Sequence, residues 1–190
     1  MISSERGAVD VAQQLATALE SSAVPYAIGG ALALAIAGVP RGTADVDLNV
    51  FVAEDRLQEV IDVLSNSGVA IDEPAARAQA HRDGMFVGRW DGMRIDVFLP
   101  SIPFAHEAQR TRVRITDEEG WSGWFLSAEA ICIFKLLFFR GKDLVDLERL
   151  VAVRPELDQP YIRRWMVDMM GEEDARIVRW DDICRRFTQS

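Results

Sequence analysis

Cysteine, histidine and lysine are scarce in this sequence, and each shortage narrows the classes of protein to which the chain can belong. Among 190 residues there are two cysteines, Cys132 and Cys184, and two histidines, His81 and His106. Two isolated cysteines provide neither a disulfide framework nor a zinc site, and the two histidines lack the spacing of metal ligands. We therefore expect no zinc centre, and Cys132, which lies in an apolar helical pattern, is predicted to be in the core.

Long apolar runs and an excess of positive charge are also missing. The most apolar stretch, 130–139, is interrupted by a lysine and is far shorter than the ~20 residues that span a bilayer. The first residues lack the basic flank and apolar core of a signal peptide. The net charge of -9 argues against broad, nonspecific binding to nucleic acid or to anionic membranes. These features predict a cytoplasmic protein with no membrane partner.

The length and the 49% hydrophobic content are sufficient for one well-packed core. Apolar periodicity, turn dipeptides and capping residues predict an α/β core over 1–125 and a helical region, packed on that core, over 126–190. The expected helices are 9–19 (capped by Ser3 or Ser4), 31–37, 57–64, 127–140 (capped by Ser127), 143–153, 160–170 and 172–187. The expected strands are 24–28, 45–52, a hairpin of 85–90 and 93–99 around Asp91-Gly92, and 110–116.

Two carboxylates lie on the strand predicted at 45–52. Asp45 and Asp47 are two residues apart, so they share one face of the strand, while Val46 and Leu48 share the other. Such a pair places hard oxygen ligands near one point, and Mg²⁺ prefers one or two carboxylates together with substrate phosphates. An acidic, solvent-exposed strand face is the alternative interpretation.

Two further features strengthen the first interpretation. Gly29 and Gly30 precede a predicted helix, where free N–H groups and a close backbone approach favour phosphate. Asp96 lies between Ile95 and Val97 on a neighbouring predicted strand, and presents one more acid as a third metal ligand or as a base. Together these residues predict a site for a nucleoside triphosphate with Mg²⁺ or Mn²⁺.

The helix over 127–140 is apolar nearly all round except for Lys135, which is one of only two lysines among 21 basic residues. A buried lysine needs an anionic partner, and a substrate phosphate is one candidate. The alternative is a lysine that reaches out of the helix to solvent. Asp143 and Asp146 lie at the start of the next predicted helix, where they either cap it or orient Arg140, Lys142 or Lys135.

Three arginines at positions 110, 112 and 114 alternate along the strand predicted over 110–116. On one strand face they would form a stripe of positive charge suited to the phosphates of a polynucleotide. A solvated sheet face is the other interpretation of the same pattern.

Taken in order, these motifs resemble the AbiEii-type nucleotidyltransferases of the DNA polymerase β-like nucleotidyltransferase superfamily. The resemblance rests on four segments, which together run from about residue 24 to 150: Ile28-Gly-Gly, Arg41-x-Thr-x-Asp-x-Asp-Leu48, Arg94-Ile-Asp96, and Lys135 followed by Arg140-x-Lys-Asp-x-x-Asp-Leu147. The resemblance implies an α+β fold, in which a mixed β-sheet is flanked by helices and followed by a C-terminal helical part.

The resemblance also implies roles for these residues. Asp45, Asp47 and Asp96 would bind Mg²⁺ and, with Lys135, carry out the transfer of a nucleoside monophosphate from a triphosphate to an acceptor hydroxyl. The implied nucleotide-binding residues are Gly29, Gly30, Arg41, Thr43, Lys135, Lys142 and Asp146. One departure stands out: such enzymes usually carry Ser or Thr soon after the glycines, whereas this chain has Ala31, Ala33 and Ala35.

The acceptor stays open at this stage. One hypothesis is tRNA, with the chain as the toxin of a toxin–antitoxin or phage-defence pair that has a cognate antitoxin protein. A second is a small molecule of the aminoglycoside or lincosamide type, which the acidic net charge favours. A third is a catalytically silent nucleotide-binding domain, which the alanines after the glycines favour.

Overall fold

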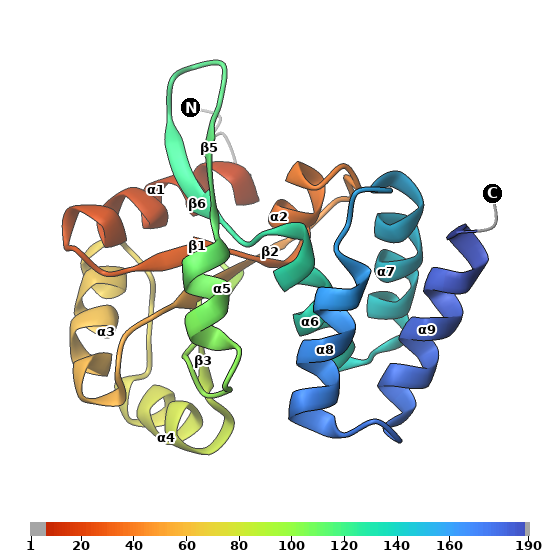
Figure 1. Ribbon diagram of the computed structural model, residues 1–190. Coiled ribbons are helices and arrows are strands. Elements are labelled where there is room, and N and C mark those ends of the chain that lie inside the picture. The colour runs from red at the N-terminus through yellow and green to blue at the C-terminus, as the bar shows by residue number, and fades with distance from the viewer. Residues whose placement is uncertain (1–6, 189–190) are drawn as a thin grey trace. The chain divides into compact units, whose positions relative to one another are not determined.

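The structure, a computed structural model, describes residues 7–188, so the predicted caps Ser3 and Ser4 lie outside the described residues. The chain divides into two compact units (Figure 1). The first contains the described residues up to Leu32 together with Gly42–Leu126. The second contains Ala33–Arg41 together with the described residues from Ser127 onward. Within the part of the chain that is described, no helix has the length and apolar character needed to cross a membrane.

A six-stranded mixed sheet forms the centre of the first unit, with the strand order β3-β4-β2-β1-β6-β5. The pairs β2–β4 and β1–β6 are parallel, and β1–β2, β3–β4 and β5–β6 are antiparallel. The strands are β1 (Tyr26–Ile28), β2 (Asp45–Val50), β3 (Met85–Trp90), β4 (Met93–Phe98), β5 (Val113–Thr116) and β6 (Ser122–Phe125).

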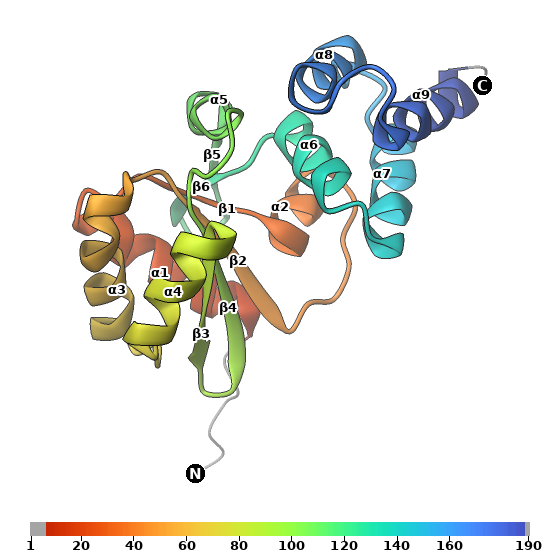
Figure 2. The same ribbon diagram turned by 90° about the horizontal axis from the view of Figure 1, so that it is seen from below.

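Helices cover this sheet. The first unit contains α1 (Ala8–Ser21), the start of α2 (Gly30–Ile36), the short 3-10 helix η1 (Glu54–Arg56), α3 (Leu57–Asn66), α4 (Glu73–Asp83) and α5 (Ala105–Thr111). The helix α1 packs against β1, β2 and β6 and lies beside α3, whereas α4 packs against β3 (Figure 2). The buried apolar side of α1 explains this placement, since Val11, Leu15 and Leu19 are fully buried beneath it.

The second unit is helical. It contains α6 (Ala128–Phe138), α7 (Gly141–Val153), α8 (Gln159–Met170) and α9 (Ala175–Thr188), with α6 packed against α7 and α8. Ser127 caps α6 as predicted, since its side chain accepts a hydrogen bond from the Ala130 N–H at 3.2 Å. Cys132 is fully buried in α6, and burial raises the pKa of its thiol well above the ordinary range. The predicted class, a mixed sheet flanked by helices and followed by a helical part, is confirmed.

The hairpin predicted around Asp91-Gly92 is present as β3 and β4. Both turn residues have positive φ, 45° for Asp91 and 85° for Gly92, which is the geometry of a tight two-residue turn. The strand predicted over 110–116 is wrong in its first half. Arg110 is the penultimate residue of α5, where it pairs with Glu107 one turn earlier, and the strand begins only at Val113.

Candidate functional site: an acidic strand face and a buried lysine cluster

The predicted acids lie on two adjacent parallel strands of the first unit. Val46 and Leu48 are fully buried, so β2 turns Asp45 and Asp47 to its other, half-buried face. The register of β2 and β4 sets Asp47 directly opposite Asp96. Neighbouring strands are ~4.8 Å apart, so two carboxylates facing each other across them repel unless a cation lies nearby. The sheet therefore brings the three predicted acids together on what we call the acidic face.

Two polar side chains contact this acidic face. The Thr43 hydroxyl donates a short hydrogen bond to Asp45 Oδ1. The Nε of Arg94 donates to Asp96 Oδ1 at 2.8 Å, and the Asp96 side chain is only 13% exposed. Sequence reasoning assigned no role to Arg94, although its position two residues before Asp96 on the same strand placed it on this face. Its charge offsets part of the repulsion among the acids.

Gly29 and Gly30 lie close against β2. The Gly29 N–H donates to the Asp47 carbonyl at 2.8 Å. Gly30 has a φ of +53°, and a β-carbon at this position would lie 1.7 Å from Asp47 Oδ2. A β-carbon on Gly29 would lie 2.7 Å from the side-chain nitrogen of Asn49. The side chain of Asp47 and the positive φ thus require glycine at position 30, a constraint that the sequence alone did not reveal.

The acidic face meets the chemical requirements of a hard divalent cation. Carboxylate oxygens are the ligands that Mg²⁺ and Mn²⁺ prefer, and a cation would relieve the repulsion across the Asp47–Asp96 pair. Among the described residues no group of three or more His, Cys, Asp or Glu side chains is arranged around a single point. The carboxylates of Asp45 and Asp96 are instead directed to Thr43 and Arg94. The donor types and their register fit such an ion.

The second unit holds the other predicted cluster. Lys135 is buried, and its Nζ lies 2.6 Å from Asp146 Oδ2 and 3.5 Å from Asp143 Oδ1. Both carboxylates are nearly inaccessible, with side chains 2% and 4% exposed. The lysine therefore does not reach out to solvent, and its nearest anionic partners are two residues of the chain itself.

Two arginines complete this lysine cluster. Arg41 Nε lies 3.4 Å from Asp146 Oδ2, and Arg140 Nε donates to Asp143 Oδ2 at 2.7 Å. Burial alone would raise the pKa of Asp143, but the hydrogen bonds and charge of Arg140 and the charge of Lys135 together lower it. The cluster thus combines three cations with two carboxylates.

The remaining predicted positions contribute less to these clusters. Lys142 is exposed, and within residues 7–188 it forms no ion pair. Ala31 and Ala33 are buried, so these positions after the glycines pack inside the protein. They do not supply the hydroxyl that the resemblance leads one to expect there.

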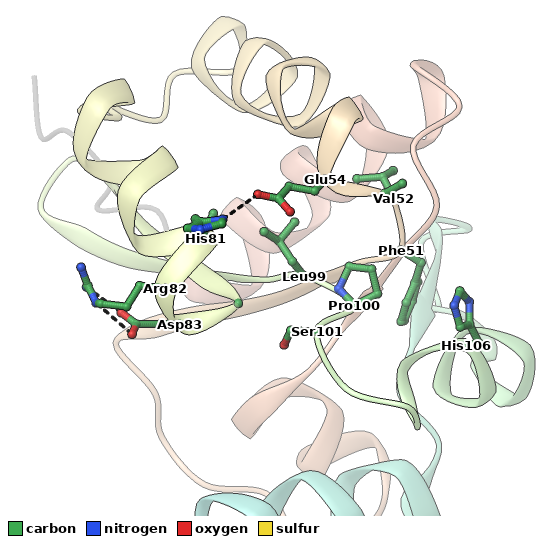
Figure 3. A pocket seen from close by; sticks show the side chains of 13 residues that line it. Phe51, Val52, Glu54, His81, Arg82, Asp83, Leu99, Pro100, Ser101 and His106 are labelled. Carbon is green, nitrogen blue, oxygen red and sulfur yellow. Dashed lines mark hydrogen bonds and ion pairs between the residues drawn. The ribbon is translucent and has the colours of Figure 1, made fainter.

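A separate cavity of about 700 Å³ opens beyond the carboxyl ends of β2 and β4 (Figure 3). Phe51 and Leu99 line it where the two strands end, and His81 and Glu54, 3.1 Å apart from Nδ1 to Oε1, also line it. The volume is in the range of small-molecule sites. None of the residues that the sequence predicts for the site lines this cavity.

Neither a family model nor a curated protein matches this chain. One similar solved structure is that of the antibiotic-resistance factor ANT(2'')-Ia in solution. Its sequence is 14% identical, the match covers 95% of this chain and 91% of that chain, and the TM-score is 0.47. The crystal structure of ANT(2'')-Ia in complex with adenylyl-2''-tobramycin has 16% identity, coverages of 92% and 95%, and a TM-score of 0.46. An antigenic nucleotidyltransferase-like protein from Paracoccidioides brasiliensis has 20% identity, coverages of 90% and 92%, and a TM-score of 0.48. At these values the likenesses do not bear on function, which has to be argued from the residues.

Proposed function

We propose that the chain is a metal-dependent nucleotidyltransferase, which transfers a nucleoside monophosphate from a nucleoside triphosphate to the hydroxyl of a small cationic acceptor. The observation that carries the proposal is the opposition of Asp47 and Asp96 on adjacent parallel strands, with Asp45 on the same face and Gly30 directly beneath Asp47. Such a concentration of half-buried acids is costly for a fold that uses them only as surface.

In this proposal Asp45 and Asp47 hold Mg²⁺ or Mn²⁺, with Asp96 as a third ligand. When bound, the ion supplies positive charge to the triphosphate oxygens. The acceptor oxygen forms a bond to the α-phosphorus, the bond from the α-phosphorus to the bridging oxygen breaks, and pyrophosphate leaves. Asp96 is also the residue that we assign to take the proton of the acceptor hydroxyl, because it lies opposite Asp47 on the same face of the sheet.

The lysine cluster lies in the second unit, and the family resemblance implies that its lysine and Arg41 bind phosphate. Asp146 holds both Lys135 and Arg41, so it fixes the positions of two cations at once. We assign nucleotide phosphate binding to Arg41 and Lys135 and a positioning role to Asp146. Thr43, which contacts Asp45 directly, positions that carboxylate.

The acceptor is inferred from charge. A net charge of -9 attracts a polycationic small molecule such as an aminoglycoside and repels a polyanion. The arginine stripe that favoured tRNA does not form, because Arg110 lies on α5 paired with Glu107 and Arg114 pairs with Glu20. The structural support for tRNA, and for a toxin with a cognate antitoxin, is thereby reduced.

To test the proposed activity, the purified protein is incubated with Mg²⁺ and with each α-³²P-labelled nucleoside triphosphate in turn. One set of acceptors is a panel of aminoglycosides and lincosamides, and the other is total tRNA. The Asp47→Asn variant is the blank, and Asp62→Asn, an exposed acid of α3 that accepts a hydrogen bond from Gln58, is the matched control.

Label on a drug that is lost in Asp47→Asn and kept in Asp62→Asn supports the proposal in full. Label on tRNA with the same variant pattern keeps the chemistry and replaces the acceptor. If triphosphate binds but no acceptor becomes labelled, the chain is a silent nucleotide-binding domain and the proposed activity is wrong.

A further inference from the structure

Arg112 lies at the junction of α5 and β5 and belongs to neither the acidic face nor the lysine cluster. It is the C-cap of α5, with φ -58° and ψ 150°. Its guanidinium carbon lies 4.5 Å from the centroid of the Trp124 ring and 6.0 Å from that of Phe51. The guanidinium therefore lies near two aromatic rings, from β6 and from the residue that follows β2, which favours a cation in this place.

The hydrogen bonds of this guanidinium are incomplete. Its Nε and Nη1 atoms are enclosed, yet they have no hydrogen-bond partner among the described residues. Native proteins satisfy most buried polar atoms, and an enclosed N–H of a charged group without an acceptor is costly. Burial and the charge of Arg114 also lower the pKa of Arg112, and the charge of Glu20 offsets only part of this effect. A contact with two aromatic rings offsets part of this cost and leaves the donors unpaired.

The charges around Arg112 leave one cation uncompensated. The nearest acid, Glu20, forms an ion pair with Arg114, which also lies over the Trp124 ring at 5.3 Å. Tyr26 is almost fully buried beside them, and both hydrogen bonds of its hydroxyl, to Glu20 and from the Trp124 N–H, are long at 3.4 Å. Burial raises the pKa of Tyr26, so the hydroxyl keeps the proton that it donates to Glu20.

A cavity of about 220 Å³ adjoins these groups, lined by Glu20, Tyr26, Arg112, Trp124 and the turn of residues 23–25. We call it the Arg112 cavity. One water molecule takes up roughly 30 Å³ of liquid, so the space suits an ion of a few heavy atoms and is too small for a nucleotide. An oxyanion there would supply the acceptor atoms and the negative charge that Arg112 lacks.

We propose that the Arg112 cavity is a binding site for a small oxyanion, such as phosphate, with Arg112 as its charged ligand. The enclosed guanidinium turns toward the anion, and stacking on Trp124 is retained. The arginine is suited to this role because its planar fork matches the oxygens of phosphate or carboxylate. This site is independent of the nucleotidyltransferase proposal, since none of its residues belongs to the acidic face or to the lysine cluster.

The test follows the arginine Nε–H signals of ¹⁵N-labelled protein while sodium phosphate is added at constant ionic strength against sodium chloride. The Arg112 signal is identified by its loss in Arg112→Lys. We expect that signal to shift saturably with phosphate and not with chloride. In Arg112→Met, which keeps the aliphatic stem, the phosphate-dependent shifts of neighbouring backbone amides should require at least ~10-fold more phosphate.

Arg164→Met is the matched control, because Arg164 also lies over an aromatic ring, that of Tyr161, at 5.5 Å. It should leave the phosphate response unchanged. The proposal is overturned if phosphate and chloride shift the Arg112 signal equally, which would mean that water alone fills the cavity. It is also overturned if a folded Arg112→Met protein keeps the full response. The titration of the unmodified protein decides the matter even if a variant fails to fold.

Discussion

Removal of the Lys135 charge should destabilise the second unit more than any substitution of an exposed charge. In Lys135→Met the aliphatic stem is retained, but Asp143 and Asp146, with side chains 2% and 4% exposed, lose the ammonium group between them. Loss of one partner of a buried ion pair costs about 3–5 kcal/mol, because the other charge stays buried. Arg41 and Arg140 still contact the two carboxylates, so we expect the lower end of this range, about 3 kcal/mol.

The assay is urea unfolding, followed through the backbone amide signals of α6 and α7 so that the second unit is observed by itself. With a denaturant slope of about 2 kcal/mol per M, the unfolding midpoint should fall by about 1.5 M. Lys142→Met is the matched control: the same substitution at an exposed lysine seven residues along the chain, where the effect should stay within about 0.5 kcal/mol. The double variant Lys135→Met/Asp146→Asn should recover at least about 1 kcal/mol of the loss, since it no longer buries that unpaired carboxylate.

Equal midpoints for Lys135→Met and Lys142→Met would refute this reasoning. They would show that Arg41 and Arg140 suffice to neutralise the two acids. Lack of recovery in the double variant would show that the cost of Lys135→Met comes from packing.

Three further outcomes follow from the same structure. Gly30→Ala should abolish nucleotidyl transfer in the α-³²P assay described above, because the added β-carbon displaces the Asp47 carboxylate. Gly42→Ala is the control and should retain activity, because a β-carbon at that position meets nothing within 4 Å. The folded-state pKa of Asp143 is lowered from 3.8, so its stabilising contribution is present above that pH and lost as the pH falls through the lower folded value. Asp143→Asn should therefore show a smaller loss of stability between pH 5 and pH 2 in urea titrations, and an unchanged acid limb would contradict this. Ser127→Ala should cost about 1 kcal/mol by removing the cap of α6, measured by the urea midpoint, and no change would mean that water replaces the cap.

Local patterns predicted much of the fold because a few residues strongly favour one backbone conformation. Asp91-Gly92 favours the turn with positive φ that joins β3 and β4, and alternation around Asp45 and Asp47 defines β2. The helix α4 was not predicted, since its buried residues are only Ala76 and Ala80 and it lacks an apolar stripe. The sequence signals for α4 lie at its two ends, where Asp72 caps the first turn and Gly84 adopts positive φ.

The arginine pattern shows where periodicity misleads. Alternation at 110, 112 and 114 has the period of a strand, but Glu107 three residues before Arg110 forms an ion pair along a helix, and α5 extends to Thr111. The pair of Glu107 and Arg110, one helical turn apart, was the sequence signal that favoured a helix here. The strand β6 was not predicted either, because its four residues between Trp121 and Leu126 are too few to show a clear period.

For the candidate site, the sequence indicated which residues belong to it more reliably than which residues they contact. The need of Lys135 for an anion follows from the apolar character of its helix, but its pairing with Asp146 depends on how α6 packs against α7. The fit of Gly30 beneath Asp47 depends on the antiparallel register of β1 and β2, which brings the end of one strand to the middle of the other. Such contacts arise from tertiary packing and leave no local pattern.

The most direct test of the account is the binding of Mn²⁺, measured by electron paramagnetic resonance with a non-hydrolysable nucleoside triphosphate present, because this measurement needs no knowledge of the acceptor. The account predicts Mn²⁺ bound by the unmodified protein and by Asp62→Asn, with at least ~10-fold weaker binding in Asp47→Asn. Equal Mn²⁺ affinity in Asp47→Asn and the unmodified protein, or no binding in either, would contradict the claim that the acidic face of β2 and β4 is a metal–nucleotide site.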